Sequence, residues 1–350
     1  MQRHRFFATT MILLASSYFP AHAQSPAEAP SAPAAPAAPA AHQAATPTAA
    51  IEVNIINPED LLDYNKTILV PAVYVSLLTE GRAAARQQSG MFQRGNASAL
   101  ASARYKVIGL DKAFAQGIAQ KACDDFVAKL RAAGYTVLTY ADIKDREPIK
   151  NAQREKGDGT IGLPTKSEGG VSYVIAAPSD EQHFKTALAW GVFAEFIQSA
   201  KPLINDATLL IPQYTIVAPQ MWGESSRGYG SVSAEIKTGP GMNLQTASVV
   251  WMGKPKSRVM RGAPGVHAKQ QVINITEKAG TLQQPADTTP QSANALSGVL
   301  SAISGAGNIQ RTSGEYAFTV DRDAYTAGAM SGIGRFNAEV AKAAAEAKPI

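Results

Sequence analysis

Residues 111–139 read DKAFAQGIAQKACDDFVAKLRAAGYTVLT, and this stretch decides the fold. Apolar side chains recur every three or four positions across its first two thirds, which predicts one amphipathic helix. Asp111 is expected to cap the start of this helix, and Gly134 is expected to end it. Residues 135–139 follow at once with β-forming side chains. The stretch therefore predicts a helix that leads directly into a strand.

Most of the segments around this unit have strand composition, in short runs rich in Val, Ile, Leu, Thr and Tyr. Proline cannot donate to a β-ladder, so the first of these strands is expected to be bulged or to start near Ala72, after Pro71. We expect a hairpin turn at 239–243, because Gly-Pro-Gly-Met-Asn separates two strand patterns. Strands are expected at residues 67–77, 104–108, 171–176, 208–218, 231–238, 244–252, 271–276 and 316–320, and further helices at 180–199 and 324–345.

Polar segments separate these elements. Residues 80–101, rich in Gly, Ala, Arg, Gln and Ser, are expected to form a mobile connection, and the Lys- and Gly-rich residues 144–170 a loop. Residues 223–228 are expected to form a polar turn. The order of elements predicts an α/β or α+β fold, in which a mixed β-sheet is packed by helices within a single globular domain over residues 51–350.

The N-terminal fifty residues indicate export. Residues 1–23 combine a cationic start, an apolar run and a small-x-small ending, which predicts a signal peptide cleaved before Gln24. Residues 24–50 are rich in Ala and Pro, which predicts an extended, disordered linker. We therefore expect a periplasmic or secreted protein. No segment has the roughly 20 apolar residues of a transmembrane helix.

Composition narrows the classes of partner. The chain has 350 residues, 45% of them hydrophobic and 17% charged, with a formal net charge of +5. These values are ordinary for a packed domain. Lys and Arg are scattered among Asp and Glu, so we expect no nucleic-acid binding. Cys123 is the only cysteine, which excludes an intramolecular disulfide, and its place in the helical pattern predicts a buried apolar role.

A search for reactive groups returns no recognisable motif. After the linker only His183 and His267 remain, with no zinc-binding or phosphate-binding spacing around them. His183 is expected at the surface, one turn into its helix. We therefore predict no cofactor, no metal and no catalytic residue. Whether the chain is an enzyme stays open, although the lack of a recognisable motif favours a non-enzymatic protein.

Two groups of residues are candidates for binding. Aromatic side chains surround the Gly- and Ser-rich segment 223–228 and could stack against sugars or peptides, although core packing is the commoner role of such residues. A flexible insertion is expected at about 277–313. A short apolar stripe within it forms either a surface helix that caps the domain or a contact site, as a partner helix or a peripheral membrane contact. The aromatic group is Tyr214, Trp222, Tyr229 and Trp251, and the stripe is Leu296, Val299, Leu300 and Ile303.

The unit 110–143, with a helix ending in Ala-Ala-Gly-Tyr-Thr-Val-Leu, resembles the helix-to-strand step of several envelope domains. These are the CsgG-like domains of curli secretion channels, the N-terminal domains of TolB, and the LpoB-type activators of peptidoglycan synthases. The strand and helix at 316–342 are compatible with the same plan. The chain departs from the lipoproteins among them, because Gln24 stands where they carry an acylated cysteine. The resemblance implies an envelope role and transfers no functional residue.

Three functions follow as hypotheses. The first is a non-catalytic periplasmic accessory or scaffold protein of the bacterial cell envelope, which acts through contacts with an envelope protein. The second is a periplasmic protein that binds a small ligand or glycan. The third is an envelope hydrolase without a recognisable motif.

Overall fold

The structure of the protein is a computed structural model. It describes residues 51–56, 66–88, 98–155, 163–167, 171–184, 202–203, 207–228, 231–239, 241–252, 265–269, 273–275, 278–283 and 309–346. The predicted signal peptide, the predicted linker, Tyr229 and the apolar stripe 296–303 lie outside these residues.

The described strands are β1 (Val53–Ile56), β2 (Thr67–Val70), β3 (Tyr74–Gln88), β4 (Ser98–Ile108), β5 (Thr136–Thr139), β6 (Leu163–Ser167), β7 (Val171–Ala176), β8 (Thr208–Val217), β9 (Gln220–Gly228), β10 (Ser231–Gly239), β11 (Met242–Met252), β12 (Gly265–Ala268), β13 (Ile273–Ile275), β14 (Gly280–Gln283) and β15 (Ile309–Val320). The described helices are α2 (Lys112–Ala132), α3 (Tyr140–Ile143), α4 (Glu147–Lys150), the 3-10 turn η1 (Asp180–Gln182) and α7 (Arg322–Glu346).

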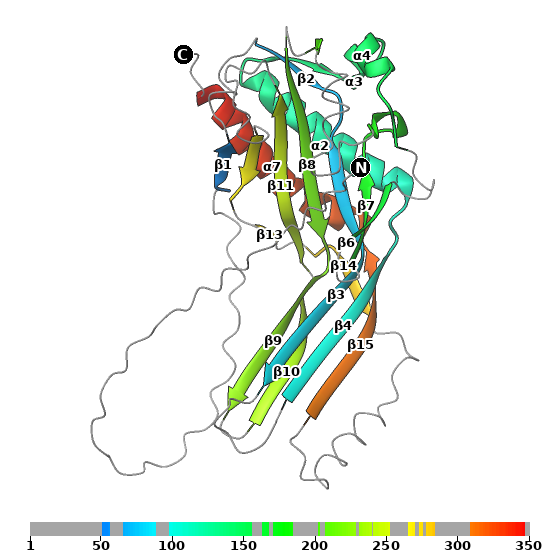
Figure 1. The fold of residues 1–350 in the computed structure, drawn as a ribbon, viewed down its shortest axis with the longest axis vertical. Coiled ribbons are helices and arrows are strands. Elements are labelled where there is room, and N and C mark those ends of the chain that lie inside the picture. Colours follow the sequence, from blue (N-terminus) through cyan, green and yellow to red (C-terminus); the bar gives the residue numbers. More distant parts are fainter. Residues whose placement is uncertain are drawn as a thin grey trace, which may run out of the picture. The chain divides into compact units, whose positions relative to one another are not determined.

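One mixed sheet of 13 strands organises the described residues, and its main path runs β1-β12-β11-β8-β3-β4-β15-β14. β9 and β10 form a separate antiparallel pair. The long helices α2 and α7 lie beside each other on one side of the sheet (Figure 1). The predicted class, a mixed sheet packed by helices, is confirmed.

Local signals explain the two long helices. Asp111 accepts a hydrogen bond from the backbone N–H of Phe114 at 2.8 Å, which caps α2 as predicted. Gly134 follows the helix with φ of +91°, a conformation that favours glycine. The predicted inward face of α7 is buried through Tyr325, Ala329, Ile333, Phe336 and Val340.

The central strand β8 is buried on both sides, which explains its nearly continuous apolar sequence. Leu210 and Ile216 belong to the core beneath α2 and α7. Leu209 and Ile211 point the other way, into a second core that includes Ile143 of α3. Because successive side chains of a strand alternate in direction, one strand supports two hydrophobic cores.

Several expected boundaries are corrected. The predicted strand 67–77 is two strands, β2 and β3, interrupted at Pro71. The predicted loop 144–170 contains α4 and β6. The predicted helix at 180–199 begins instead as the 3-10 turn η1, and Phe184 forms a β-bridge with Arg154. Its later residues lie outside the described part of the chain.

The hairpin predicted around residues 239–243 joined the wrong pair of strands. β10 pairs with β9 and not with β11, which pairs with β8 instead. The expected polar turn at 223–228 is therefore part of strand β9. Strands also occupy parts of the segment 277–313 that was predicted as an insertion: β14 lies near its start, and β15 begins at Ile309. Residues 284–308 are not described.

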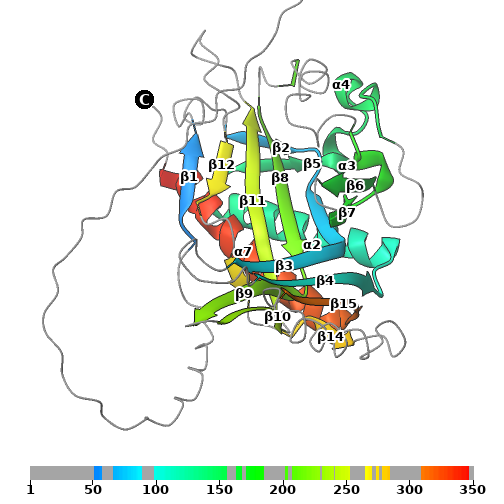
Figure 2. The ribbon, with the colours of Figure 1, turned by 60° about the horizontal axis from the view of Figure 1, so that its bottom comes forward.

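The largest correction concerns residues 80–101, which were expected to form a mobile connection. β3 continues through Gln88 and β4 begins at Ser98, so both strands extend past the long helices (Figure 1). β15 runs parallel to β4 along the same stretch. The pair β9–β10 packs against β3 and β4 as a second layer (Figure 2). We call this two-layered part, residues 80–88, 98–106, 220–228, 231–239 and 309–317, the β extension.

Small residues fill the space between the two layers of the β extension. Ala83 and Ala85 of β3 are buried, as are Ala99, Ala101 and Ala103 of β4. An alanine methyl group occupies little depth, so the two layers approach closely. This explains why a segment of low β-propensity forms long strands: burial against the second layer replaces intrinsic preference.

Candidate functional site

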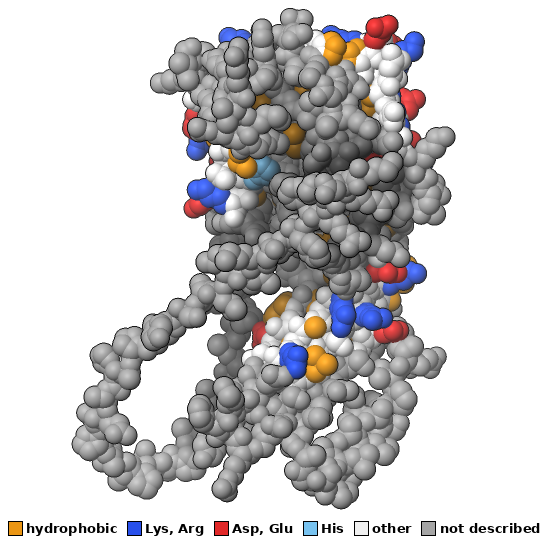
Figure 3. All heavy atoms as spheres, viewed as in Figure 1, with side chains coloured by type: hydrophobic (Ala, Val, Ile, Leu, Met, Phe, Trp, Pro, Cys, Tyr) orange, Lys and Arg blue, Asp and Glu red, His pale blue; other side chains and the backbone are white. Residues whose placement is uncertain are grey.

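The outward surface of the β extension carries most of its charge. Because strand residues alternate in direction, the residues that neighbour the buried alanines point away from the second layer. We call this surface the basic face, made of Glu80, Arg82, Ala84 and Arg86 of β3, Leu100, Ser102, Arg104 and Lys106 of β4, and Glu315 of β15. Figure 3 shows Lys and Arg side chains gathered over this part of the molecule, with fewer carboxylates between them.

The strand register places like charges opposite each other. Arg82 of β3 is the direct cross-strand partner of Arg104 of β4, and both side chains are exposed. Directly opposed like charges destabilise an antiparallel pair. Neither arginine forms an ion pair with another described residue. The fold thus holds two guanidinium groups together without a described counter-charge between them.

Two glutamates flank the arginines. Glu80 lies opposite Lys106, and Glu315 lies opposite Arg104 in the parallel register. Glu80 also accepts a long hydrogen bond, 3.4 Å, from the Ser172 hydroxyl. The basic face therefore has mixed charge, with an excess of positive groups.

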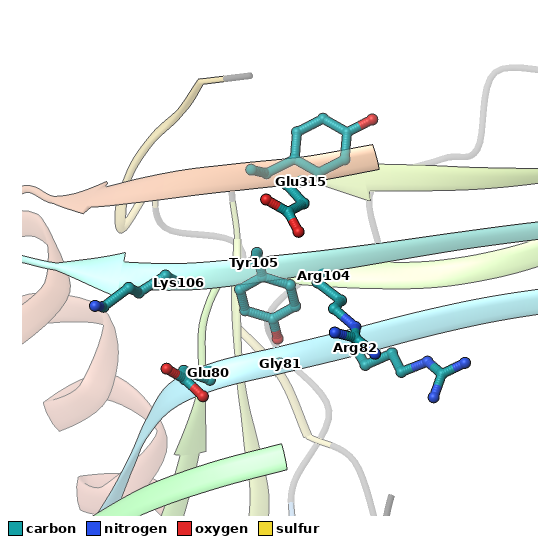
Figure 4. Close-up of a pocket in the computed structure, with 8 residues that line it drawn as sticks. Glu80, Gly81, Arg82, Arg104, Tyr105, Lys106 and Glu315 are labelled. Atoms are coloured by element: carbon teal, nitrogen blue, oxygen red, sulfur yellow. The ribbon is translucent and has the colours of Figure 1, made fainter. Parts of the chain in front are cut away.

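A hollow of about 540 Å³ lies where β3, β4 and β15 meet the body of the domain (Figure 4). It is lined by five charged residues of the basic face and by Gly81, Tyr105 and Tyr316; the charged residues are Glu80, Arg82, Arg104, Lys106 and Glu315. The Tyr105 ring lies across Gly81, where an added Cβ would be 2.1 Å from its Cζ atom. Burial raises the pKa of Tyr105 well above its ordinary value, so its hydroxyl stays protonated. Arg82 and Arg104 lie side by side to the right of Tyr105 in this view.

Two of the four residues of the predicted aromatic surface are buried. Tyr214 and Trp251 are buried in the core beneath α2 and α7, while Trp222 of β9 is 36% exposed. The Nε1–H of Trp222 donates to Glu224 at 2.9 Å on the same strand. Core packing therefore accounts for two of the four residues, and Tyr229 is not described.

The two histidines lie on different elements, His183 directly after the 3-10 turn η1 and His267 on the strand β12. His183 is buried, contrary to the surface position expected for it, and its Nε2 has no hydrogen-bond partner among the described residues. Its ring stacks with that of Tyr74 at 6.5 Å between centroids. The Tyr74 hydroxyl donates to the Gln182 carbonyl at 2.8 Å, which holds η1 against the sheet. Half-buried His267 lies on β12.

Acidification is expected to destabilise the fold through His183. Burial lowers the pKa of His183 below its ordinary value of 6.5, although Asp180 and the Ile175 carbonyl oppose this shift. The unfolded chain therefore binds the proton more readily, and stability falls as the pH drops through about 6.5 toward the folded-state pKa. Urea unfolding at about pH 7.5 and about pH 5.5 measures this loss.

The variant His183→Phe is expected to reduce the pH dependence between these two conditions. The remainder comes from His267, whose pKa is also lowered by burial. An identical pH dependence in wild type and His183→Phe would contradict the assignment.

Other reactive groups are dispersed in the part of the chain that the structure describes. No group of three or more His, Cys, Asp or Glu side chains there could hold a metal ion. Cys123 is buried as predicted, and burial raises the pKa of its thiol to about 12. Neither α2, α7 nor a shorter described helix has the length and apolar character needed to cross a bilayer.

Comparisons with protein-family models, with curated proteins and with solved structures find no match for this chain. The candidate site is therefore defined by its own geometry.

The sequence contains a signal for the strand β3 that its Gly-, Ala- and Arg-rich composition obscured. Gly81, Ala83 and Ala85 alternate with Arg82, Ala84 and Arg86. This is the two-residue period of a strand with one buried face.

Proposed function

We propose that this chain is a non-catalytic accessory or scaffold protein of the bacterial cell envelope, exported by its N-terminal signal, that binds an envelope protein through the basic face. The observation that carries the proposal is the opposed pair Arg82 and Arg104. Their repulsion is retained on an exposed surface, and it is relieved when a partner supplies negative charge.

The strands that form and underlie the basic face favour binding by a preformed surface. β3, β4 and β15 are paired along the whole extension, and β9–β10 covers their inner side. A backbone that is hydrogen-bonded on this scale loses little conformational freedom when a partner docks. The resemblance to envelope domains is consistent with such a role.

In-cell photo-crosslinking tests the proposal. A photoreactive residue in place of Ser102, within the basic face, is expected to form an adduct with an envelope protein in the periplasmic fraction. The same residue in place of Lys121, exposed on α2, is the matched control and is expected to give no such adduct. Equal adducts at both positions, or none at Ser102, would reject the basic face as the binding surface. Recovery of uncleaved chain from the cytosol would reject export.

A further inference from the structure

Five charged side chains gather at the end of the basic face nearest the body of the domain. They line the hollow of about 540 Å³ and come from three neighbouring strands (Figure 4). Three of them are positive and two are negative, and all five are exposed. The hollow is therefore a surface site that offers charge of both signs.

Opposite charges face each other in this hollow without closing into ion pairs. Glu80 is the cross-strand partner of Lys106, and Glu315 lies in line with Arg104. None of the five groups forms an ion pair with a residue in the described part of the chain. A ligand that fills the hollow can therefore contact both signs.

The arginine pair and the nearest glutamate are a short distance apart. Arg82 lies two residues beyond Glu80 on β3, and Figure 4 shows Glu80 on the opposite side of Tyr105 from the two arginines. Two residues of a strand span about 7 Å at roughly 3.4 Å per residue. An extended dipeptide with free ends holds its ammonium and carboxylate groups about the same distance apart. Its charges match the spacing in the hollow.

We propose that the hollow binds a small zwitterion of the amino-acid or short-peptide class. The carboxylate lies between Arg82 and Arg104, where two guanidinium groups donate to it and their mutual repulsion is relieved. The ammonium group lies toward Glu80. The inference goes beyond the proposed function, because it assigns a small ligand to one end of the basic face.

The charge pattern favours a zwitterion over a simple ion. An inorganic phosphate ion is attracted to the arginine pair, but it also meets Glu80 and Glu315 in the same hollow. A cation without an anionic group meets an excess of positive charge. A ligand that carries both signs pairs with each part of the lining.

An NMR titration of the purified, isotope-labelled chain tests the inference. The probe is glycylglycine; its acetylated form lacks the ammonium group, and its amidated form lacks the carboxylate. At low salt we expect glycylglycine to shift the amide signals of residues 80–82 and 104–106. The acetylated control is expected to bind about two- to fivefold more weakly, the effect of one exposed ion pair. The amidated control is expected to bind at least about fivefold more weakly, because two guanidinium groups lose their acceptor.

Variants separate ligand binding from folding. Arg82→Gln removes an opposed like charge, so the thermal midpoint is expected to stay equal or rise while the glycylglycine affinity falls at least about fivefold. Glu80→Gln is expected to weaken glycylglycine about two- to fivefold without weakening its acetylated form. Lys121→Gln removes an exposed positive charge from α2, and this matched control is expected to leave both affinities unchanged.

Four results would overturn the inference. They are the lack of a saturable shift with glycylglycine, equal binding of glycylglycine and its acetylated form, tighter binding of inorganic phosphate than of glycylglycine, and shifts confined to residues outside the hollow. Each is distinguishable from failure of the proposed function. The titration contains only the chain and a small ligand, whereas photo-crosslinking through Ser102 reports a protein partner in the cell.

Discussion

Replacing Gly223 with alanine is expected to lower the free energy of unfolding by about 1–3 kcal/mol, the usual cost of overpacking. Gly223 lies on β9, which packs against β3 in the β extension. A Cβ atom at this position would be 2.4 Å from the Ala84 carbonyl oxygen and 2.8 Å from the Ala85 Cβ. Both obstacles belong to the backbone or to a side chain that cannot rotate away. The two layers must therefore separate locally.

Gly117→Ala is the matched control for this substitution. Gly117 lies within α2, and an added Cβ there meets no atom within 4 Å. Removing a helical glycine is expected to raise the free energy of unfolding by about 0.5–1 kcal/mol. Urea unfolding of the two variants beside the wild type measures both effects. A Gly223→Ala protein as stable as Gly117→Ala would show that the layers are not in close contact.

Replacing Asn337 with leucine is expected to cost about 1–3 kcal/mol, because it leaves a buried hydroxyl without an acceptor. The Tyr214 hydroxyl donates to Asn337 Oδ1 at 2.5 Å, and Asn337 Nδ2 donates to Asp125 Oδ2 at 2.8 Å. Asp125 also pairs with Lys129 one turn along α2. Burial raises the pKa of Tyr214, so its hydroxyl remains a donor. One side-chain network therefore ties β8, α7 and α2 together.

A double-mutant cycle with Tyr214→Phe tests this network. Each single substitution leaves one buried polar group unpaired, whereas the double variant removes both groups of the Tyr214–Asn337 bond. The double variant is expected to lose less stability than the sum of the two single variants, as measured by chemical unfolding. Strict additivity would mean that the hydrogen bond contributes nothing specific to the packing of α7.

The helices could be predicted because their signals are local. Asp111, Gly134 and the three-to-four-residue apolar period lie within one continuous segment, and each acts on its own few neighbours. The same holds for the buried face of α7. The mixed sheet followed from short β-forming runs between the helices.

The β extension could not be predicted in the same way. Apart from Tyr105, the buried residues on the inner face of β3 and β4 are Gly and Ala, whose small size has value only when a second layer lies within a few ångströms. That second layer is β9–β10, more than a hundred residues away in the sequence. The position of His183 likewise depends on Tyr74 and on the β-bridge of the next residue, Phe184, neither of which a helical pattern reveals.

The order of residues alone established the class of fold, the two long helices and the expectation of export, because these depend on interactions between near neighbours along the chain. The pairing of β3, β4 and β15 established the candidate site, since Arg82 and Arg104 become neighbours only when two strands align in one register. Charge that is scattered in the sequence is gathered by strand pairing. Alanines that seem featureless in the sequence allow the two layers to approach closely and support that face.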